Sequence, residues 1–199
     1  MKFDASCVVV KGPDHNGAFQ AEFKALEAAG CKILNCPNEQ AVLTFIVMKK
    51  GSIKTLYIAC HGAEDGKFAQ CFDTDGKSEI MVSPMTYIVQ CAQYGITVCL
   101  ATCYSARAIT TLCAQYAGMD FSSNKNEDTE STCRVWCCAG PNQTARGMHF
   151  YNFLSGKDYI NSDDSGTFYD ITVELKMDGD KSSWVAKAER IPLKQALDA

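Results

Sequence analysis

Two apolar runs of strand length each end at a side chain that could take part in nucleophilic catalysis. Residues 57–62 (YIACHG) reach His61, and residues 96–106 (ITVCLATCYSA) reach Cys103. A cysteine thiolate can attack a carbonyl carbon, and a nearby imidazolium can protonate the leaving amine. The two residues therefore predict acyl-transfer chemistry, provided that the fold brings the two strand ends together.

The residues that flank this pair favour the same chemistry. A helix is expected to start near Ala106, and a helix that begins just after Cys103 favours the reactive thiolate. Gly62 follows His61 and lets the backbone approach a ligand closely. We expect the backbone amides of Gly62 and Cys103 to stabilise the oxyanion that forms during attack.

Each of the two residues also has a simpler interpretation. A histidine at a strand end is in most proteins a hydrogen-bonded structural residue. The chain has twelve cysteines, and most are expected to be buried free thiols, so one at a strand end could arise by chance. Order, spacing and strand context together favour catalysis. A metal site built from Cys60, His61 and Cys103 is a weaker alternative, because neighbouring strand residues point to opposite faces.

The elements that must position the pair alternate between strands and helices. Strands are predicted at 6–11, 32–35, 55–60, 96–101 and 133–139, and helices at 18–29, 39–50, 84–93, 106–117 and around 147–154. The first residue of the third helix is Pro84, with Ser83 as its N-cap. Asp75-Gly76 and Asp178-Gly179 each predict the turn of a β-hairpin.

This alternation predicts an α/β fold with a mostly parallel sheet, helices on both faces and β-hairpin insertions. Sequential parallel strands are usually neighbours, about 5 Å apart, so the strands at 55–60 and 96–101 are expected side by side. Active sites of such sheets lie at the carboxyl ends of the strands. His61 and Cys103 both fall there.

Length and composition predict one domain over residues 1–199. The net charge is −4 and no cluster of Lys and Arg appears, which argues against nucleic acid as a partner. No apolar run approaches the roughly eighteen residues of a membrane span. The N-terminal segment lacks the apolar core of a secretory signal, which predicts a cytoplasmic protein. The motifs indicate no cofactor.

The segments LYIACHG (56–62) and ITVCLATC (96–103) resemble the catalytic motifs of the caspase-like cysteine peptidases of clan CD, in wording most similar to CHAT domains. In that family His-Gly follows one hydrophobic strand and Cys follows the next. The hairpin after the histidine and RVWCCAGPNQTARGMHFYNFL (134–154) are similar too, so the resemblance spans about residues 53–155. The caspase signature Gln-Ala-Cys-x-Gly is absent, since Tyr104 and Ser105 follow Cys103.

The resemblance implies a caspase-like fold and a cysteine endopeptidase that cleaves protein or peptide substrates through a thioacyl-enzyme intermediate. Cys103 would be the nucleophile and His61 the general acid and base, while residues near Asn142, Gln143 and Arg146 would bind the substrate. Relatives often need an activating partner or ligand. The alternative is a catalytically silent pseudo-protease that serves as a protein-binding or scaffold module.

Two further features bear on substrates and processing. Asp65, Asp73 and Asp75 could favour a basic substrate residue, although a solvated loop and a turn explain them more simply. The polar loop at 120–132 is either an exposed site for self-processing or an ordinary surface loop. The remaining histidines, His15 and His149, are assigned structural or surface roles.

Overall fold

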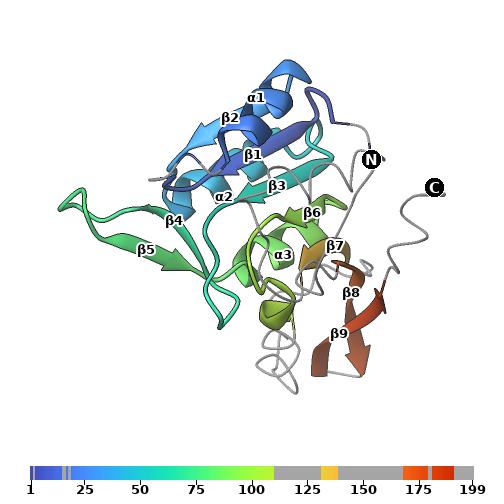
Figure 1. Ribbon diagram of the computed structural model, residues 1–199. Helices are drawn as coiled ribbons and strands as arrows, with labels where there is room; N and C mark the ends of the chain where they lie inside the picture. The colour runs from blue at the N-terminus through green and yellow to red at the C-terminus, as the bar shows by residue number, and fades with distance from the viewer. Residues whose placement is uncertain are drawn as a thin grey trace.

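The described residues form a seven-stranded sheet with a separate two-stranded hairpin beside it (Figure 1). The computed structural model describes residues 1, 3–14, 17, 19–109, 131–138, 168–178 and 181–190. In spatial order the strands of the main sheet are β2 (Lys32–Asn35), β1 (Cys7–Lys11), β3 (Thr55–Ala59), β6 (Thr97–Leu100), β7 (Thr132–Cys138), β8 (Phe168–Asp178) and β9 (Lys181–Arg190).

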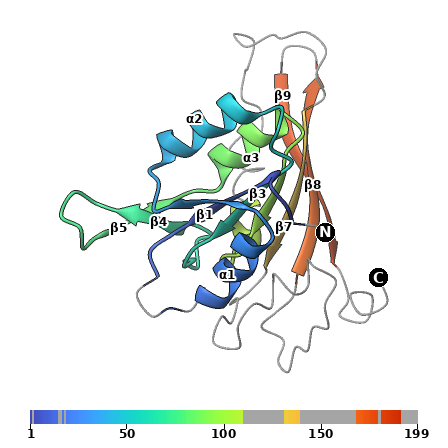
Figure 2. The same cartoon turned by 90° about the horizontal axis from the view of Figure 1, so that it is seen from above.

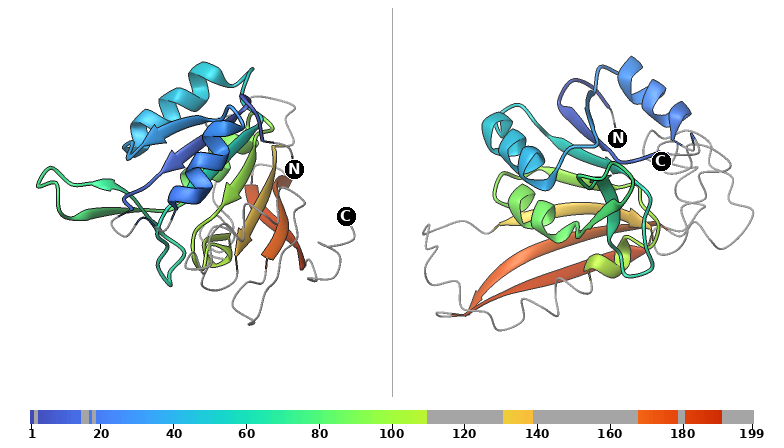
Figure 3. Two further views of the ribbon diagram at one scale, coloured as in Figure 1. Left: turned by 45° about the horizontal axis from the view of Figure 1, so that its top comes forward. Right: turned by 90° about the vertical axis from the view of Figure 1, so that its left-hand side faces the viewer.

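The strands from β2 to β7 run parallel to one another. β8 and β9 then extend the sheet beyond β7 as an antiparallel pair (Figure 3). Their register ends at Asp178 opposite Lys181, so the hairpin predicted there is confirmed. The prediction of an α/β fold with a mostly parallel sheet is confirmed as well. β3 is the middle one of the five parallel strands and is buried along its whole length, as expected for a parallel strand that is covered on both faces.

Helices cover both faces of the sheet (Figure 2). They are α1 (Gln20–Ala28), α2 (Glu39–Lys49) and α3 (Met85–Ala92). Alternate side chains of β3 divide between two cores: Leu56 and Ile58 pack with residues of α2 and α3, whereas Tyr57 and Ala59 pack with residues of α1. We call these the α2/α3 face and the α1 face of the sheet.

The hairpin predicted around Asp75-Gly76 also forms, from β4 (Phe68–Phe72) and β5 (Glu79–Val82). It projects away from the main sheet (Figure 1). Gly76 adopts a φ of 67°, which glycine reaches without steric cost. The Asp75 carboxylate accepts two following backbone amides at 2.8 Å each and closes the turn.

The helix α3 starts one residue later than predicted, and the helix predicted from residue 106 is described only in part. Ser83 was expected to be the N-cap of α3, but Pro84 occupies that position, and the Ser83 hydroxyl accepts the Met85 amide at 3.3 Å. Residues 106–109 are helical as predicted. The rest of that predicted helix and the one around 147–154 lie outside the described residues. In the part of the chain that the structure describes, no helix has both the length and the apolar character needed to cross a membrane.

Candidate active site

His61 and Cys103 occupy matching positions beyond the ends of two neighbouring strands. β3 and β6 are adjacent and parallel, and their last paired residues are Ile58 and Leu100. The Ala101 amide donates a hydrogen bond to the Ile58 carbonyl at 2.8 Å, so the pairing continues past this point. His61 and Cys103 each lie three residues further along. The expectation that these two strands are neighbours is therefore confirmed.

The strand ends meet at Gly62. A Cβ atom on this glycine would lie 2.3 Å from the Cys103 carbonyl oxygen and 2.6 Å from the Cys103 amide nitrogen. Real Cβ atoms do not approach backbone atoms so closely, so only glycine allows this contact. Gly66 makes a second such approach, since a Cβ there would lie 2.5 Å from the Ala108 nitrogen. The loop after His61 is thus packed directly on the turn that carries Cys103.

The Gly62 amide is not used by the neighbouring hairpin. Gly62 forms a single antiparallel bridge with Phe68. The hydrogen bonds of this bridge come from the flanking residues: Ala63 donates to the Lys67 carbonyl, and Ala69 donates to the His61 carbonyl, each at 2.8 Å. In such a pair the central residue's own N–H points away from its partner strand. The Gly62 amide is therefore directed away from β4, as an oxyanion donor would require.

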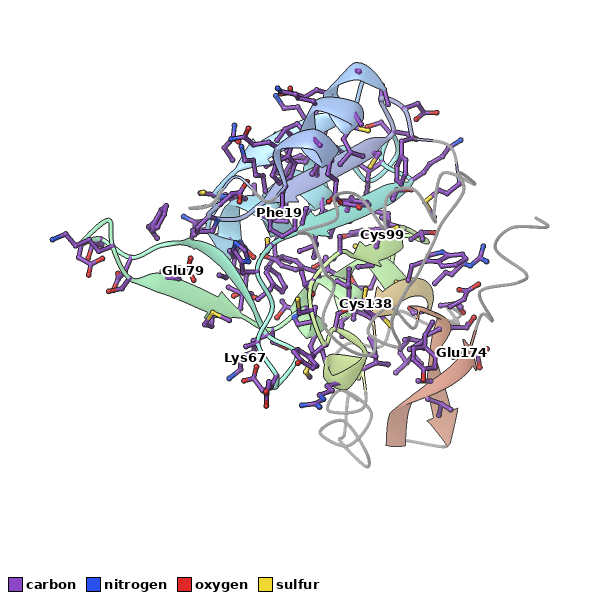
Figure 4. The ribbon with its side chains drawn as sticks, viewed as in Figure 1. Phe19, Lys67, Glu79, Cys99, Cys138 and Glu174 are labelled. Carbon is purple, nitrogen blue, oxygen red and sulfur yellow. The ribbon has the colours of Figure 1, made fainter. Side chains whose placement is uncertain are left out.

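The imidazole of His61 rests against an aromatic ring from the start of α1. The ring centroids of Phe19 and His61 are 5.2 Å apart in an edge-on arrangement. Figure 4 labels Phe19. Phe19 is buried, and its amide donates a hydrogen bond to the Asp14 carboxylate at 3.2 Å. Sequence reasoning missed Phe19, because nothing in its local pattern indicates a contact with a residue so distant in the chain.

The turn after Cys103 contains two further residues that sequence reasoning did not single out as functional. Tyr104 has a φ of 54°, in the left-handed region that residues other than glycine seldom adopt. Ser105 is fully buried. Its hydroxyl donates to the Leu100 carbonyl at 3.2 Å and accepts the Cys138 amide at 2.9 Å. Ser105 therefore ties the Cys103 turn to the ends of β6 and β7.

Cys103 is also distinguished by its access to solvent. All described cysteines are free thiols, and all except Cys36 and Cys103 are buried. Desolvation is the largest cause that raises the pKa of Cys36, and it raises the pKa of buried thiols such as Cys60 and Cys91 well above the usual value. Since the thiolate is the reactive species, these cysteines are poor nucleophiles. Cys31 is the exception, because a hydrogen bond with Cys7 lowers its pKa, but it is buried.

A buried carboxyl group lies on the α1 face of the sheet. Glu22 of α1 is 3% exposed, and its Oε1 accepts a hydrogen bond from the Tyr57 hydroxyl. Desolvation raises the pKa of Glu22 to about 7, and the Tyr57 hydrogen bond opposes this rise. Burial is also the largest cause that raises the pKa of the Cys138 thiol on the same face of the sheet.

Several residues named from the sequence lie outside the described residues. They are the expected substrate-binding residues Asn142, Gln143 and Arg146, the histidines His15 and His149, and most of the 120–132 loop.

The three aspartates considered for binding a basic substrate residue have local roles. Asp65, Asp73 and Asp75 are all exposed. Asp65 accepts the Lys67 amide and forms an ion pair with its ammonium at 3.2 Å. Asp73 and Asp75 accept backbone amides within the β4–β5 turn. The simpler interpretation as loop and turn residues accounts for these contacts.

A metal site is not supported among the described residues, where no three His, Cys, Asp or Glu side chains are grouped to hold an ion. Cys60 packs on the α2/α3 face, whereas His61 contacts Phe19 of the α1 face, so neighbours along the chain diverge as predicted.

No protein-family model and no curated protein sequence matches this chain. The geometry and chemistry of the site therefore provide the basis for a functional assignment.

Proposed function

We propose that this chain is a cysteine endopeptidase with a caspase-like fold, in which Cys103 is the nucleophile and His61 the general acid and base. The observation that carries the proposal is the packing of Gly62 on the Cys103 backbone at the ends of two adjacent parallel strands. That contact brings a thiol, an imidazole and two backbone amides to one edge of the sheet.

The reaction uses each of these groups in turn. The Cys103 thiolate attacks the peptide carbonyl carbon and forms a C–S bond, while the amides of Gly62 and Cys103 stabilise the oxyanion. The imidazolium of His61 gives its proton to the leaving nitrogen as the C–N bond breaks. His61 then takes a proton from water as the water oxygen attacks the thioester carbonyl, and the C–S bond breaks to release the acid product and the Cys103 thiolate. Asn142, Gln143 and Arg146 are proposed to bind the substrate residue before the scissile bond.

The accessibility of the thiols supports the same assignment. Cys103 is one of two described cysteines that are partly exposed, and the other, Cys36, has a raised pKa because of desolvation. Cys36 is therefore a matched control: it is similarly accessible but lacks a neighbouring strand end that carries histidine. The difference in labelling rate between Cys103 and Cys36 therefore measures the increase in thiol reactivity that the site provides.

The test is covalent labelling with a library of peptidyl acyloxymethyl ketones that varies the residue next to the ketone. We expect mass spectrometry to find modification at Cys103, with a rate that falls at least about 100-fold in His61→Ala, the usual contribution of general acid–base catalysis. Cys36→Ala should leave the rate unchanged. Cys103→Ala should prevent both labelling and peptide hydrolysis.

Labelling that is spread over several cysteines and is indifferent to His61 would contradict the peptidase proposal. Binding of a protein partner that survives Cys103→Ala, without any hydrolysis in the wild type, would then favour the pseudo-protease alternative. The two functions are distinguished because binding does not need the thiol, whereas cleavage does.

A further inference from the structure

We propose that Arg107 is a positioning residue that holds the turn after Cys103 in the conformation needed by the nucleophile. Its catalytic consequence rests on the peptidase function proposed above, whereas its effect on the turn can be measured without any activity. Arg107 is exposed and lies in the helical turn at 106–109. It would act through Tyr104 and Glu64.

The turn needs support because Tyr104 is strained. Its φ of 54° places a bulky aromatic residue in the left-handed region, where its Cβ atom crowds the backbone. Residues in such conformations persist only where the surrounding contacts hold them, and they cluster at functional sites. Tyr104 immediately follows Cys103, so its conformation decides how the peptide unit between the two residues is oriented.

Arg107 contacts this turn through both its side chain and its backbone. Its guanidinium carbon lies 4.9 Å from the centroid of the Tyr104 ring, which is cation–π geometry. Its backbone amide donates a hydrogen bond to the Tyr104 carbonyl at 3.0 Å. The Arg107 side chain therefore contacts the Tyr104 ring, and the Arg107 backbone amide binds the Tyr104 carbonyl. Tyr104 is the strained residue that follows the nucleophile.

Arg107 also connects this turn to the loop that carries His61. Its Nη1 donates a hydrogen bond to the Glu64 carbonyl at 2.7 Å. The inner part of that loop is already packed on the turn through Gly62 and Gly66. The guanidinium adds a polar connection at the outer side, where the loop is exposed. The loop after β3 and the turn after β6 are thus held together by close packing at Gly62 and Gly66 and by the hydrogen bond from Arg107.

The chemical consequence follows from the contact at Gly62. The Cys103 carbonyl lies against Gly62, in the peptide unit that joins Cys103 to Tyr104. If Tyr104 relaxed to an ordinary conformation, this peptide unit would turn and the Cys103 backbone would shift against Gly62. Small displacements of reacting groups cost large factors in rate. Lysine cannot replace arginine fully, because its ammonium lacks the planar fork that stacks and donates at the same time.

The test compares Arg107→Ala and Arg107→Lys with Lys50→Ala, a matched control. Lys50 makes the same kind of contact, 4.9 Å from the centroid of the Tyr94 ring, remote in sequence from the site. With a peptidyl acyloxymethyl ketone that labels Cys103, we expect Arg107→Ala to lower the maximal rate of modification about tenfold, the factor for losing one hydrogen bond and one cation–π contact. The half-saturating probe concentration should change little. Arg107→Lys should retain part of the rate, and Lys50→Ala all of it.

A second variant separates positioning from a direct contact with substrate. Tyr104→Gly removes the strain, because glycine adopts a positive φ freely. In the Tyr104→Gly background, Arg107→Ala should therefore lower the rate much less than in the wild type. Equal losses in both backgrounds, or a wild-type rate in Arg107→Ala, would overturn the inference.

Hydrogen exchange measures the effect of Arg107 on the turn after Cys103 whether or not the protein is a peptidase. If wild-type labelling does not depend on His61, the proposed function is wrong, but Arg107→Ala should still speed exchange of the backbone amides at positions 107 and 108, which donate to the Tyr104 and Ser105 carbonyls, relative to Lys50→Ala. Unchanged exchange at these amides would overturn the positioning role independently of activity.

Discussion

Gly62→Ala is expected to abolish the reactivity of Cys103 and to destabilise the fold by about 2 to 3 kcal/mol, the cost of overpacking a closely packed interior. The added methyl group would lie 2.3 Å and 2.6 Å from backbone atoms of Cys103. No side-chain rotation can relieve such a clash, so one of the two strand ends must move. Either movement separates His61 from Cys103 and disturbs the two amides proposed to bind the oxyanion.

The measurements are labelling of Cys103 and urea unfolding of the same variant. Gly51→Ala is the matched control, because a Cβ atom at Gly51 meets nothing within 4 Å. The control should label like the wild type and unfold at a similar urea concentration. If Gly62→Ala labelled at the wild-type rate, the two strand ends would not be packed as described, and the main observation behind the proposed function would be lost.

The contribution of Glu22 to the free energy of unfolding is expected to fall by about 3 kcal/mol as the pH rises from 4 to 8.5, because Glu22 must ionise inside an apolar core. The carboxyl has a pKa of about 7 in the folded chain and an ordinary value of 4.5. Between these two values the folded state binds more protons than the unfolded state. Stability contributed by the protonated form is therefore complete below about pH 4.5 and is lost as the pH rises through about 7.

Glu22→Gln should remove this dependence, because the amide stays neutral and its oxygen can still accept the Tyr57 hydroxyl. We expect the variant to match the wild type near pH 5 or below and to exceed it by up to about 3 kcal/mol above pH 8. Urea unfolding at a series of pH values measures the difference. Glu27→Gln, at an exposed position on the same helix, is the control and should run parallel to the wild type. If the stability of Glu22→Gln changed with pH in parallel with that of the wild type, the raised pKa of Glu22 would be contradicted.

Neighbouring groups do not produce the same signal in this pH range. The residues around Glu22 include Tyr57, Cys99 and Cys138, and burial raises the pKa of each, so none ionises below pH 9. The difference between wild type and Glu22→Gln isolates one carboxyl group.

Much of the fold was predictable because its signals are local. Asp75-Gly76 marks a turn whatever surrounds it, and the apolar runs of β1, β3 and β6 have the length and composition of strands buried on both faces. The order of β3 and β6 also followed, because sequential parallel strands tend to be neighbours. The N-cap of α3 was misplaced by one residue, since Ser83 and Pro84 both suit a helix start.

The contacts around the site were less predictable because they join segments that are far apart in the chain. Phe19 has the pattern of an ordinary core residue, yet its ring lies beside His61. Arg107 has the pattern of an exposed helix residue, yet it bonds to Glu64. Both contacts arise from packing between elements, which leaves no periodic signal in the sequence.

Residue types and their alternation were enough to predict that His61 and Cys103 follow two apolar strands, with a glycine after the histidine, because such patterns are local in the chain. Three properties of the folded chain have no such local signal: Gly62 packs on the Cys103 backbone, Tyr104 is held in the left-handed region, and Glu22 is buried. These properties depend on how close two backbones approach and on which side chains exclude water. Both are set by the packing of the sheet against its helices and loops.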